Sequence, residues 1–169
     1  KGFLKGKEKP QVLDLCTGSG CIGITLALEC PESKVTLVEK YDTASIYAWK
    51  NIAKLEVKNA VLMAGDVFEG TANEDKYDLI VSNPPYIPIN EMKTVSPEVE
   101  YEPETALVAG EDGMMFYNTI VDNYKQSLNA GGMLAFEVGI GEADTVSKIM
   151  TDAGLENVRI QKDMNGIDR

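Results

Sequence analysis

The sequence predicts an α/β domain built on a doubly wound, mostly parallel sheet with helices on both faces. Three observations lead to this prediction. Short apolar runs alternate with segments of helical period, which is the pattern of successive βα units. A glycine-rich turn directly follows the first apolar run and precedes a helical segment. The length of 169 residues, 44% of them apolar, suits a single hydrophobic core.

The first half of the chain predicts three strands with two helices between them. Its strands are short apolar runs that end at a glycine or an acidic residue, and its helices have apolar residues at helical spacing. The first helix stops at Pro31, which a helix cannot easily accommodate. We expect strands at 12–15, 35–38 and 61–63, and helices over 22–29 and 43–55.

The second half repeats the alternation. The run 77–82 (YDLIVS) is apolar enough for a buried strand, and Gly131-Gly132 predicts a turn ahead of another. We expect strands at 77–82, 133–138 and 158–161, and helices over 113–128 and 142–153.

One long segment, residues 87–112, has no clear period and contains three prolines. Loops of this length are uncommon in compact domains unless they are functional or disordered. Because the segment follows the carboxyl end of a strand, where open α/β sheets bind ligands, we interpret it as a substrate loop or lid. A plain insertion remains the alternative.

Composition excludes several classes of site. The chain has no histidine, which rules out a Ser-His-Asp triad and any histidine-ligated metal, so we expect no metal. Sixteen basic and 27 acidic residues give a net charge of −11, which disfavours a nucleic-acid partner. The odd number of cysteines, three, argues against a disulfide framework and indicates a reducing compartment. With no apolar run long enough for a membrane span, we expect a cytoplasmic protein that does not contact membranes.

The glycine-rich turn predicts an adenosine-containing cofactor. Residues 18–23 (GSGCIG) match G-x-G-x-x-G between a strand and a helix, which allows close approach of a ligand to the backbone. Glu39, at the end of the second strand, is placed to accept hydrogen bonds from ribose. Asp14 would repel a pyrophosphate but attract an ammonium and a sulfonium, which favours S-adenosylmethionine over a dinucleotide. A structural role for Asp14 stays open.

Two further residues follow the third strand. Asp66 could accept from an adenine amino group, and a solvated turn acid is nearly as good an interpretation. Val67 could flank the adenine ring, or be an ordinary core residue.

The sharpest motif is Asn83-Pro84-Pro85-Tyr86, directly after the strand at 77–82. Two prolines remove N–H donors and fix φ, so the turn is rigid and presents acceptors only. Acceptors from Asn83 and the Pro84 carbonyl would bind both hydrogens of a planar NH2 group, and Tyr86 offers a face for stacking. The motif therefore predicts methyl transfer to a conjugated amino nitrogen, either an amide or the exocyclic NH2 of a nucleic-acid base.

With these motifs the chain resembles the release-factor glutamine methyltransferases, which are class I, Rossmann-like enzymes. The resemblance runs through most of the chain. The segments that carry it are 12–20, 81–87, 101–103, 106–107, 110–113, 136–139, 163 and 166–169.

The resemblance implies a reaction and a set of site residues. The substrate would be the glutamine of the Gly-Gly-Gln motif in a peptide chain release factor, modified for translation termination, with S-adenosylhomocysteine as the product. The cofactor residues would be Asp14, Cys16, Thr17, Gly18, Ser19, Gly20, Glu39, Asp66, Val67 and Asn83, and the substrate residues Asn83, Pro84, Pro85 and Tyr86. Of these, Asn83, Pro84 and Tyr86 would be catalytic.

The chain departs from the family pattern in three ways. We expect residues 1–169 to be a catalytic domain alone, because nothing in it matches the family's N-terminal helical domain for substrate recognition. We also expect the last strand of the fold to be missing, since the family continues beyond Arg169. Finally, the segment Ile140-Gly141-Glu142 stands where a glutamine is common, and Glu39 replaces the more frequent aspartate. Two other functions are alternative interpretations of the sequence: a dinucleotide oxidoreductase, and a module that binds the cofactor without turnover.

Overall fold

The computed structural model describes residues 2–70, 75–92 and 103–169. They form two compact units. The first comprises Lys1–Asn83 and Gln126–Ala135, and the second Pro84–Lys125 and Phe136–Arg169. That residues 1–169 act as one catalytic domain remains a prediction.

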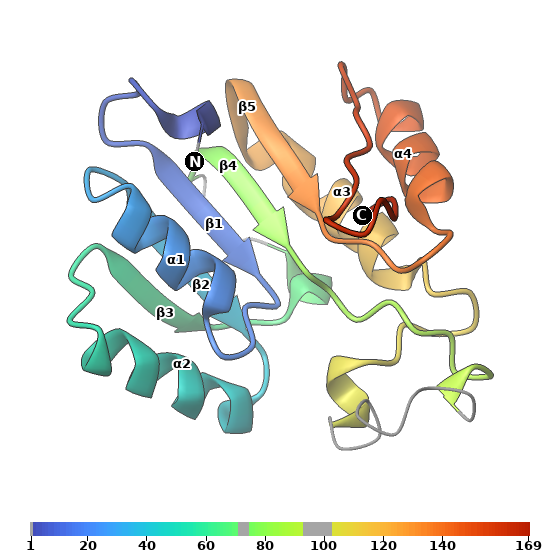
Figure 1. Cartoon of the computed structure of the whole chain (residues 1–169), viewed down its shortest axis with the longest axis horizontal. Coiled ribbons are helices and arrows are strands. Elements are labelled where there is room, and N and C mark those ends of the chain that lie inside the picture. The colour runs from blue at the N-terminus through green and yellow to red at the C-terminus, as the bar shows by residue number, and fades with distance from the viewer. Residues whose placement is uncertain (1, 71–74, 93–102) are drawn as a thin grey trace. The chain divides into compact units, whose positions relative to one another are not determined.

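A five-stranded sheet, in the order β3-β2-β1-β4-β5, is the framework of the first unit. Its strands are β1 (Gln11–Leu15), β2 (Lys34–Glu39), β3 (Ala60–Ala64), β4 (Tyr77–Ser82) and β5 (Leu128–Phe136), which runs one residue past the unit. The pairs β1–β2, β1–β4 and β2–β3 are parallel, and the β5 arrow runs in the direction of β4 (Figure 1). The strands β2 and β3 lie on one side of β1, and β4 and β5, which come later in the chain, lie on its other side. Such a switch point, between β1 and β4, is where open α/β sheets bind ligands.

Two helices of the first unit, α1 (Cys21–Glu29) and α2 (Asp42–Lys54), pack against this sheet. The central strand β1 is buried from Val12 to Leu15, as expected for a parallel strand with neighbours on both sides. One core cluster joins Val12, Val35 and Leu37 of the strands to Ile24 of α1, with Ile52 of α2 packed against it. Both helices therefore share one apolar layer with the sheet. The predicted α/β class is confirmed.

Gly23 allows α1 to approach the sheet closely. A Cβ atom at this position would lie 2.7 Å from Asp14 Oδ2 and 2.9 Å from Leu37 Cγ. We therefore expect Gly23→Ala to lower the free energy of unfolding by about 1–3 kcal/mol, the usual range for overpacking a core. Urea denaturation measures this. Gly2→Ala is the matched control, since a Cβ at Gly2 meets nothing within 4 Å; equal losses in both variants would contradict the expectation.

The second unit contains α3 (Met115–Tyr124) and α4 (Ala143–Asp152), which contact each other. Its apolar cluster includes the fully buried Tyr117, whose ring meets Phe136 edge to face at 5.3 Å between centroids. Short 3-10 helices occur at Gly2–Leu4 and Val67–Glu69 in the first unit, at Glu104–Ala106 in the second, and at Lys125–Ser127.

Two sequence predictions in the second half are wrong in detail. Gly131-Gly132 lies inside β5 instead of ahead of it, because the positive φ of Gly131 (71°) lets the strand bend without ending. The strand predicted at 158–161 is absent from the described residues. There the chain folds back on itself, with Arg169 N donating to Gln161 O and Asp163 N to Ile167 O.

The long segment 87–112 is described at its two ends, and residues 93–102 lie outside the described part. The ends pair with each other: Ile87 N donates to Leu107 O, and Ala109 N donates to Ile87 O. Leu107 and Ala109 are buried. The two described ends of the segment therefore lie side by side. Its role as a substrate loop stays a prediction.

Among the helices of the described residues, none combines the length and apolar character that crossing a bilayer would require.

Candidate active site

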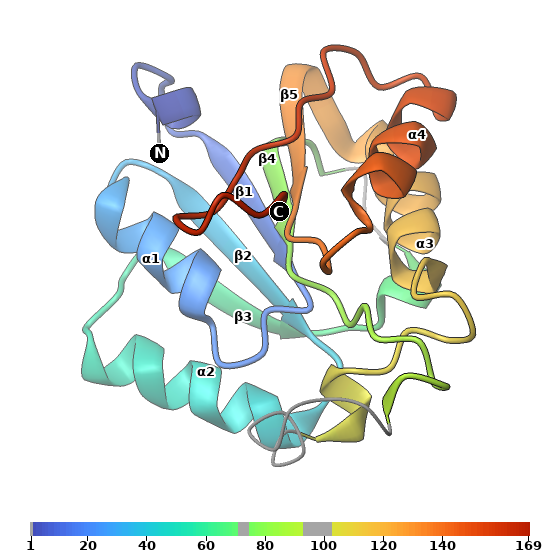
Figure 2. The same ribbon diagram turned by 45° about the vertical axis from the view of Figure 1, so that its right-hand side comes forward.

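The carboxyl ends of four strands meet at one edge of the sheet. Leu15 of β1 is in register with Val38 of β2 and with Ser82 of β4, and Glu39 with Ala64 of β3. The residues that follow these strands therefore lie at the same edge (Figure 2). This brings together the predicted cofactor residues of the first unit: Asp14, Cys16, Thr17, Gly18, Ser19, Gly20, Glu39, Asp66 and Asn83.

The glycine loop turns through left-handed backbone conformations at Cys16 (φ 55°), Gly18 (φ 58°) and Gly20 (φ 86°). Glycine adopts them without strain, whereas Cys16 must be held there. Two backbone hydrogen bonds stabilise the loop next to Cys16. Thr17 N donates to Val38 O of β2 at 3.0 Å, and Gly20 N donates to Thr17 O. A Cβ at Gly18 would meet nothing within 4 Å, so the loop leaves open space there. Such an open backbone suits close approach of a ligand.

Asp14 is buried with only 1% of its surface exposed. Its Oδ2 accepts from Thr17 Oγ1 at 2.5 Å and from Gly23 N at 2.7 Å, so it ties the loop to the first turn of α1. Its Oδ1 is buried and has no hydrogen-bond partner. Burial raises the pKa of Asp14 to about 6, opposed by these two hydrogen bonds. The residue is both a brace of the loop and a buried acceptor with unused capacity, an arrangement that favours a cationic or N–H-bearing ligand.

Glu39 holds the loop from the β2 side. Its Oε2 accepts from Gly18 N at 2.8 Å, and its Oε1 accepts from Tyr41 N at 2.9 Å. A carboxylate oxygen can accept more than one hydrogen bond, so capacity for ribose hydroxyls remains. The ribose role of Glu39 stays a prediction, to which the structure adds a bracing role that the spacing of the sequence did not reveal.

Asp66 is paired with Lys40, 2.8 Å from its Oδ2, and its Oδ1 accepts from Phe68 N at 3.0 Å. Burial acts to raise the pKa of Asp66, but the Lys40 ammonium and the Phe68 N–H outweigh it and leave the pKa below its ordinary value. Asp66 is thus ionised and an acceptor at neutral pH. Val67 is 3% exposed, so the structure supports its interpretation as a core residue.

Three positioning residues were missed by the sequence analysis. Lys40 orients Asp66, Asn51 of α2 donates to Ser19 O at 2.9 Å, and Ser82 of β4 donates to Leu15 O at 2.8 Å. Each depends on a partner far along the chain or on an adjacent strand, so no local motif signals it.

The surroundings of Cys16 favour its protonated thiol. Burial, with the nearby Glu39 carboxylate, raises the pKa of the Cys16 thiol to about 12. All three cysteines are free, and no group of metal-ligating side chains occurs among the residues the structure describes.

The proline motif spans the boundary between the units. Asn83 ends the first unit and is exposed directly after β4, whereas Pro84 and Pro85 are buried in the second unit. Tyr86 is half-buried against the apolar cluster of that unit. Burial thus adds packing to the restricted φ of both prolines. The rigidity of the turn stays a prediction.

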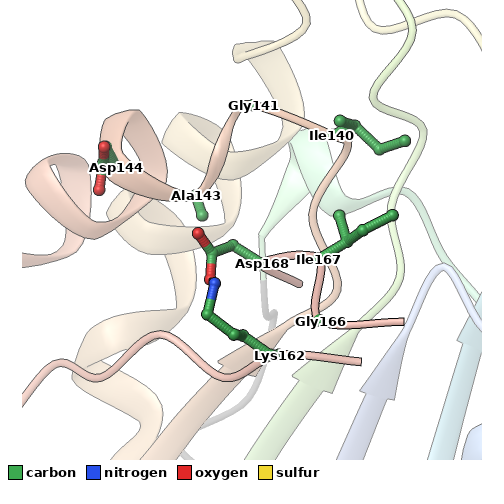
Figure 3. Close-up of a pocket in the computed structure, with 8 residues that line it drawn as sticks. All are labelled: Ile140, Gly141, Ala143, Asp144, Lys162, Gly166, Ile167 and Asp168. Carbon is green, nitrogen blue, oxygen red and sulfur yellow. The ribbon is translucent and has the colours of Figure 1, made fainter. Parts of the chain in front are cut away.

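A separate pocket lies in the second unit around the C-terminal turn (Figure 3). Its volume is about 260 Å³. It holds the Lys162–Asp168 ion pair (2.7 Å), with Asp144 of α4 at its edge. None of the predicted site residues lines this pocket.

A family model, described as the methyltransferase small domain, matches residues 3–102. The chain belongs to this family. The fold agrees: a methyltransferase dependent on S-adenosylmethionine from Aquifex aeolicus superimposes with a TM-score of 0.64 at 20% identity, over 96% of this chain and 80% of that one. A second such enzyme, TehB-like, from Corynebacterium glutamicum, gives 0.56 at 18%, over 93% and 70%. The class I methyltransferase fold predicted from the sequence is therefore confirmed.

Curated relatives are more similar in sequence. The chain is 43% identical to the release factor glutamine methyltransferase of Geobacter sulfurreducens, over 94% of this chain and 55% of that protein. It is 38% identical to the enzyme of the same name from Thermodesulfovibrio yellowstonii, over 94% and 57%. A ribosomal protein uL3 glutamine methyltransferase from Xanthomonas campestris is 38% identical over 98% and 53%. The chain spans about half the length of these relatives.

Proposed function

We propose that this chain transfers a methyl group from S-adenosylmethionine to the side-chain amide nitrogen of a protein glutamine. The observation that carries the proposal is an exposed Asn83 on a proline-locked turn, directly after β4 at the edge that carries the glycine loop. The substrate we propose is the glutamine of the Gly-Gly-Gln motif in a peptide chain release factor. That choice draws on the names of the relatives and makes the cytoplasm the site of reaction.

The residues fit the cofactor. The buried Asp14 Oδ1 without a partner suits the ammonium of the methionine part, which would supply both a positive charge and N–H donors. Glu39 would bind the ribose hydroxyls and Asp66 the adenine amino group. The open space at Gly18 leaves the loop backbone accessible. When bound, S-adenosylmethionine supplies an electrophilic methyl group on a sulfonium.

Asn83 and Pro84 would hold the amide that reacts. A glutamine NH2 is a weak nucleophile because its lone pair is delocalised into the carbonyl. The Asn83 side-chain oxygen and the Pro84 carbonyl accept its two hydrogens, which orients the nitrogen and stabilises the positive charge that grows on it. The nitrogen–carbon bond would form as the sulfur–carbon bond of S-adenosylmethionine breaks, which would leave S-adenosylhomocysteine. The extra proton on nitrogen is then strongly acidic and leaves to water, so no histidine or other base is needed.

An assay with methyl-labelled S-adenosylmethionine tests the proposal. The chain is offered a release factor, ribosomal protein uL3 and bulk RNA and DNA in parallel, and mass spectrometry locates the label. We expect label on the Gly-Gly-Gln glutamine, and none when that glutamine is changed to glutamate. Label on uL3 alone would support glutamine methylation but identify uL3, and not a release factor, as the substrate. Label on nucleic acid alone, or no label while the cofactor binds, would overturn the proposal.

Glu39 gives a prediction for cofactor binding alone. Glu39→Gln replaces one acceptor oxygen by an NH2 group, which then faces the N–H of Gly18 or Tyr41. Hydrogen bonds to charged groups contribute about 1.5–3 kcal/mol, so we expect at least about a tenfold weaker affinity for S-adenosylhomocysteine by calorimetry. Glu32→Gln, an exposed glutamate, is the control and leaves the affinity unchanged. An unaltered affinity in Glu39→Gln would argue against this site.

A further inference from the structure

Glu142 is the carboxylate at the centre of the second unit's hydrogen-bond network. It lies just before α4, and its Oε2 accepts from Gly139 N at 2.9 Å and from Tyr117 Oη at 3.3 Å. Tyr117 is fully buried, and its single hydroxyl proton is shared between Glu142 Oε2 and Glu137 O, which lies 3.1 Å from Tyr117 Oη. The side chain thus joins the segment after β5 to α3 and to the start of α4.

The same carboxylate lies against Tyr86, the residue we assign to the substrate. The surroundings of two glycines, Gly139 and Gly113, each show this proximity. A Cβ at Gly139 would be 2.8 Å from Glu142 Oε2 and 3.0 Å from Tyr86 Cδ2, so the carboxylate and the ring edge share that side of the strand end. A Cβ at Gly113 would be 2.8 Å from Glu142 Oε1 and 2.6 Å from the Tyr86 carbonyl oxygen. Glu142 therefore lies near Tyr86 on two sides, beside the ring at Gly139 and beside the backbone carbonyl at Gly113.

We propose that Glu142 is a positioning residue for Tyr86, and that its protonated or amide form holds the substrate turn better than its ionised form. Ionised, Oε1 is an acceptor on the side of Gly113 where the Tyr86 carbonyl, a second acceptor, also lies, and it has no proton to donate. With a proton on Oε1, the carboxyl becomes a donor on that side of Gly113, while Oε2 still accepts from Gly139 N and Tyr117 Oη. A glutamine has this pattern at every pH, with an NH2 in place of the O–H.

The surroundings favour the protonated form. Burial, with the carboxylates of Glu91 and Asp112 from the two ends of the segment 87–112, raises the pKa of Glu142. Tyr117 of α3 and Tyr86 face it as neutral groups, and the exposed Asp144 follows on α4. No salt bridge to Glu142 is found among the described residues. Arg169, which donates to Val138 O, is paired instead with Asp163 at 3.7 Å.

The kinetic test rests on the proposed function and compares Glu142→Gln with the parent chain. At saturating cofactor, we expect the KM for a Gly-Gly-Gln substrate to rise in the parent as pH increases through the titration of Glu142, and to stay flat in Glu142→Gln. The ratio of the two profiles cancels the titration of Asp14. We expect Glu142→Ala to raise KM about tenfold or more with a smaller change in kcat, and glutamine at 142 to rescue it. Affinity for S-adenosylhomocysteine stays the same in all of them.

A second test needs no turnover, so it separates failure of this inference from failure of the proposed function. With carbon-13 in the rings of the seven tyrosines, Tyr86→Phe assigns the Tyr86 signal in NMR spectra. We expect that signal to titrate with pH in the parent and in the control Asp144→Asn, and not in Glu142→Gln. A Tyr86 signal and a KM profile that are the same in the parent and in Glu142→Gln would overturn the inference.

Discussion

Replacing Asn83 by alanine is expected to reduce methyl transfer by about 100-fold to 1000-fold, the loss typical of removing one preorganised group that stabilises transition-state charge. Asn83 offers a directional acceptor next to Pro84 and Pro85, which are buried and have a restricted φ. The side chain itself is exposed, so the thermal midpoint should not change. A steady-state assay with labelled methyl groups measures kcat, and calorimetry measures cofactor affinity, which we expect to change less than tenfold.

Two variants sharpen the Asn83 experiment. Asn83→Asp keeps an acceptor oxygen at the same place, so it should retain more activity than Asn83→Ala. Asn165→Ala removes an exposed asparagine from the C-terminal turn and should behave as the parent. If Asn83→Ala turns over within a few-fold of the parent, the proposed role of the amide acceptor is wrong.

Cofactor affinity is expected to fall as pH drops through about 6, because Asp14 becomes protonated there. Burial opposes the charged form of Asp14 and raises its pKa to about 6. Above that pH the carboxylate attracts the ammonium of the bound cofactor, and below it the attraction is lost, by up to about tenfold per pH unit. Calorimetric titration with S-adenosylhomocysteine between pH 5 and 8 measures this profile.

Asp14→Asn provides the comparison. Its affinity should be at least about tenfold lower than that of the parent at pH 7.5 and nearly independent of pH, while Asp42→Asn, an exposed residue of α2, should follow the parent. The pH dependence of folding stability has the opposite sign to that of cofactor affinity. Since the pKa is raised in the folded state, the contribution of Asp14 to stability is greatest below its unfolded value and is lost as pH rises through about 6. Parallel pH profiles for the parent and Asp14→Asn would refute a charge-based role.

Local pattern was sufficient for most of the secondary structure. The strand at 77–82 was predicted to the residue, and the helices α1 and α2 to within a residue or so at each end. The errors lie where a non-local partner decides the outcome. β5 continues through Gly131 and is hydrogen-bonded to β4, which lies far earlier in the chain. Residues 158–161 form no strand, and Gln161 O instead accepts from Arg169 N in the following turn.

The chemistry of the site divides in the same way. The sequence by itself determined the glycine loop, the acidic residues at the strand ends and the rigid Asn83-Pro84-Pro85-Tyr86 turn, since each is a contiguous motif with a local physical cause. Only the tertiary structure decided that Glu39 and Asp14 brace the loop, that Lys40 pairs with Asp66, and that Glu142 lies against Tyr86. Glu142 and Tyr86 are 56 positions apart in the chain. Contacts of this kind depend on packing and burial, which alternation of apolar and polar residues does not encode.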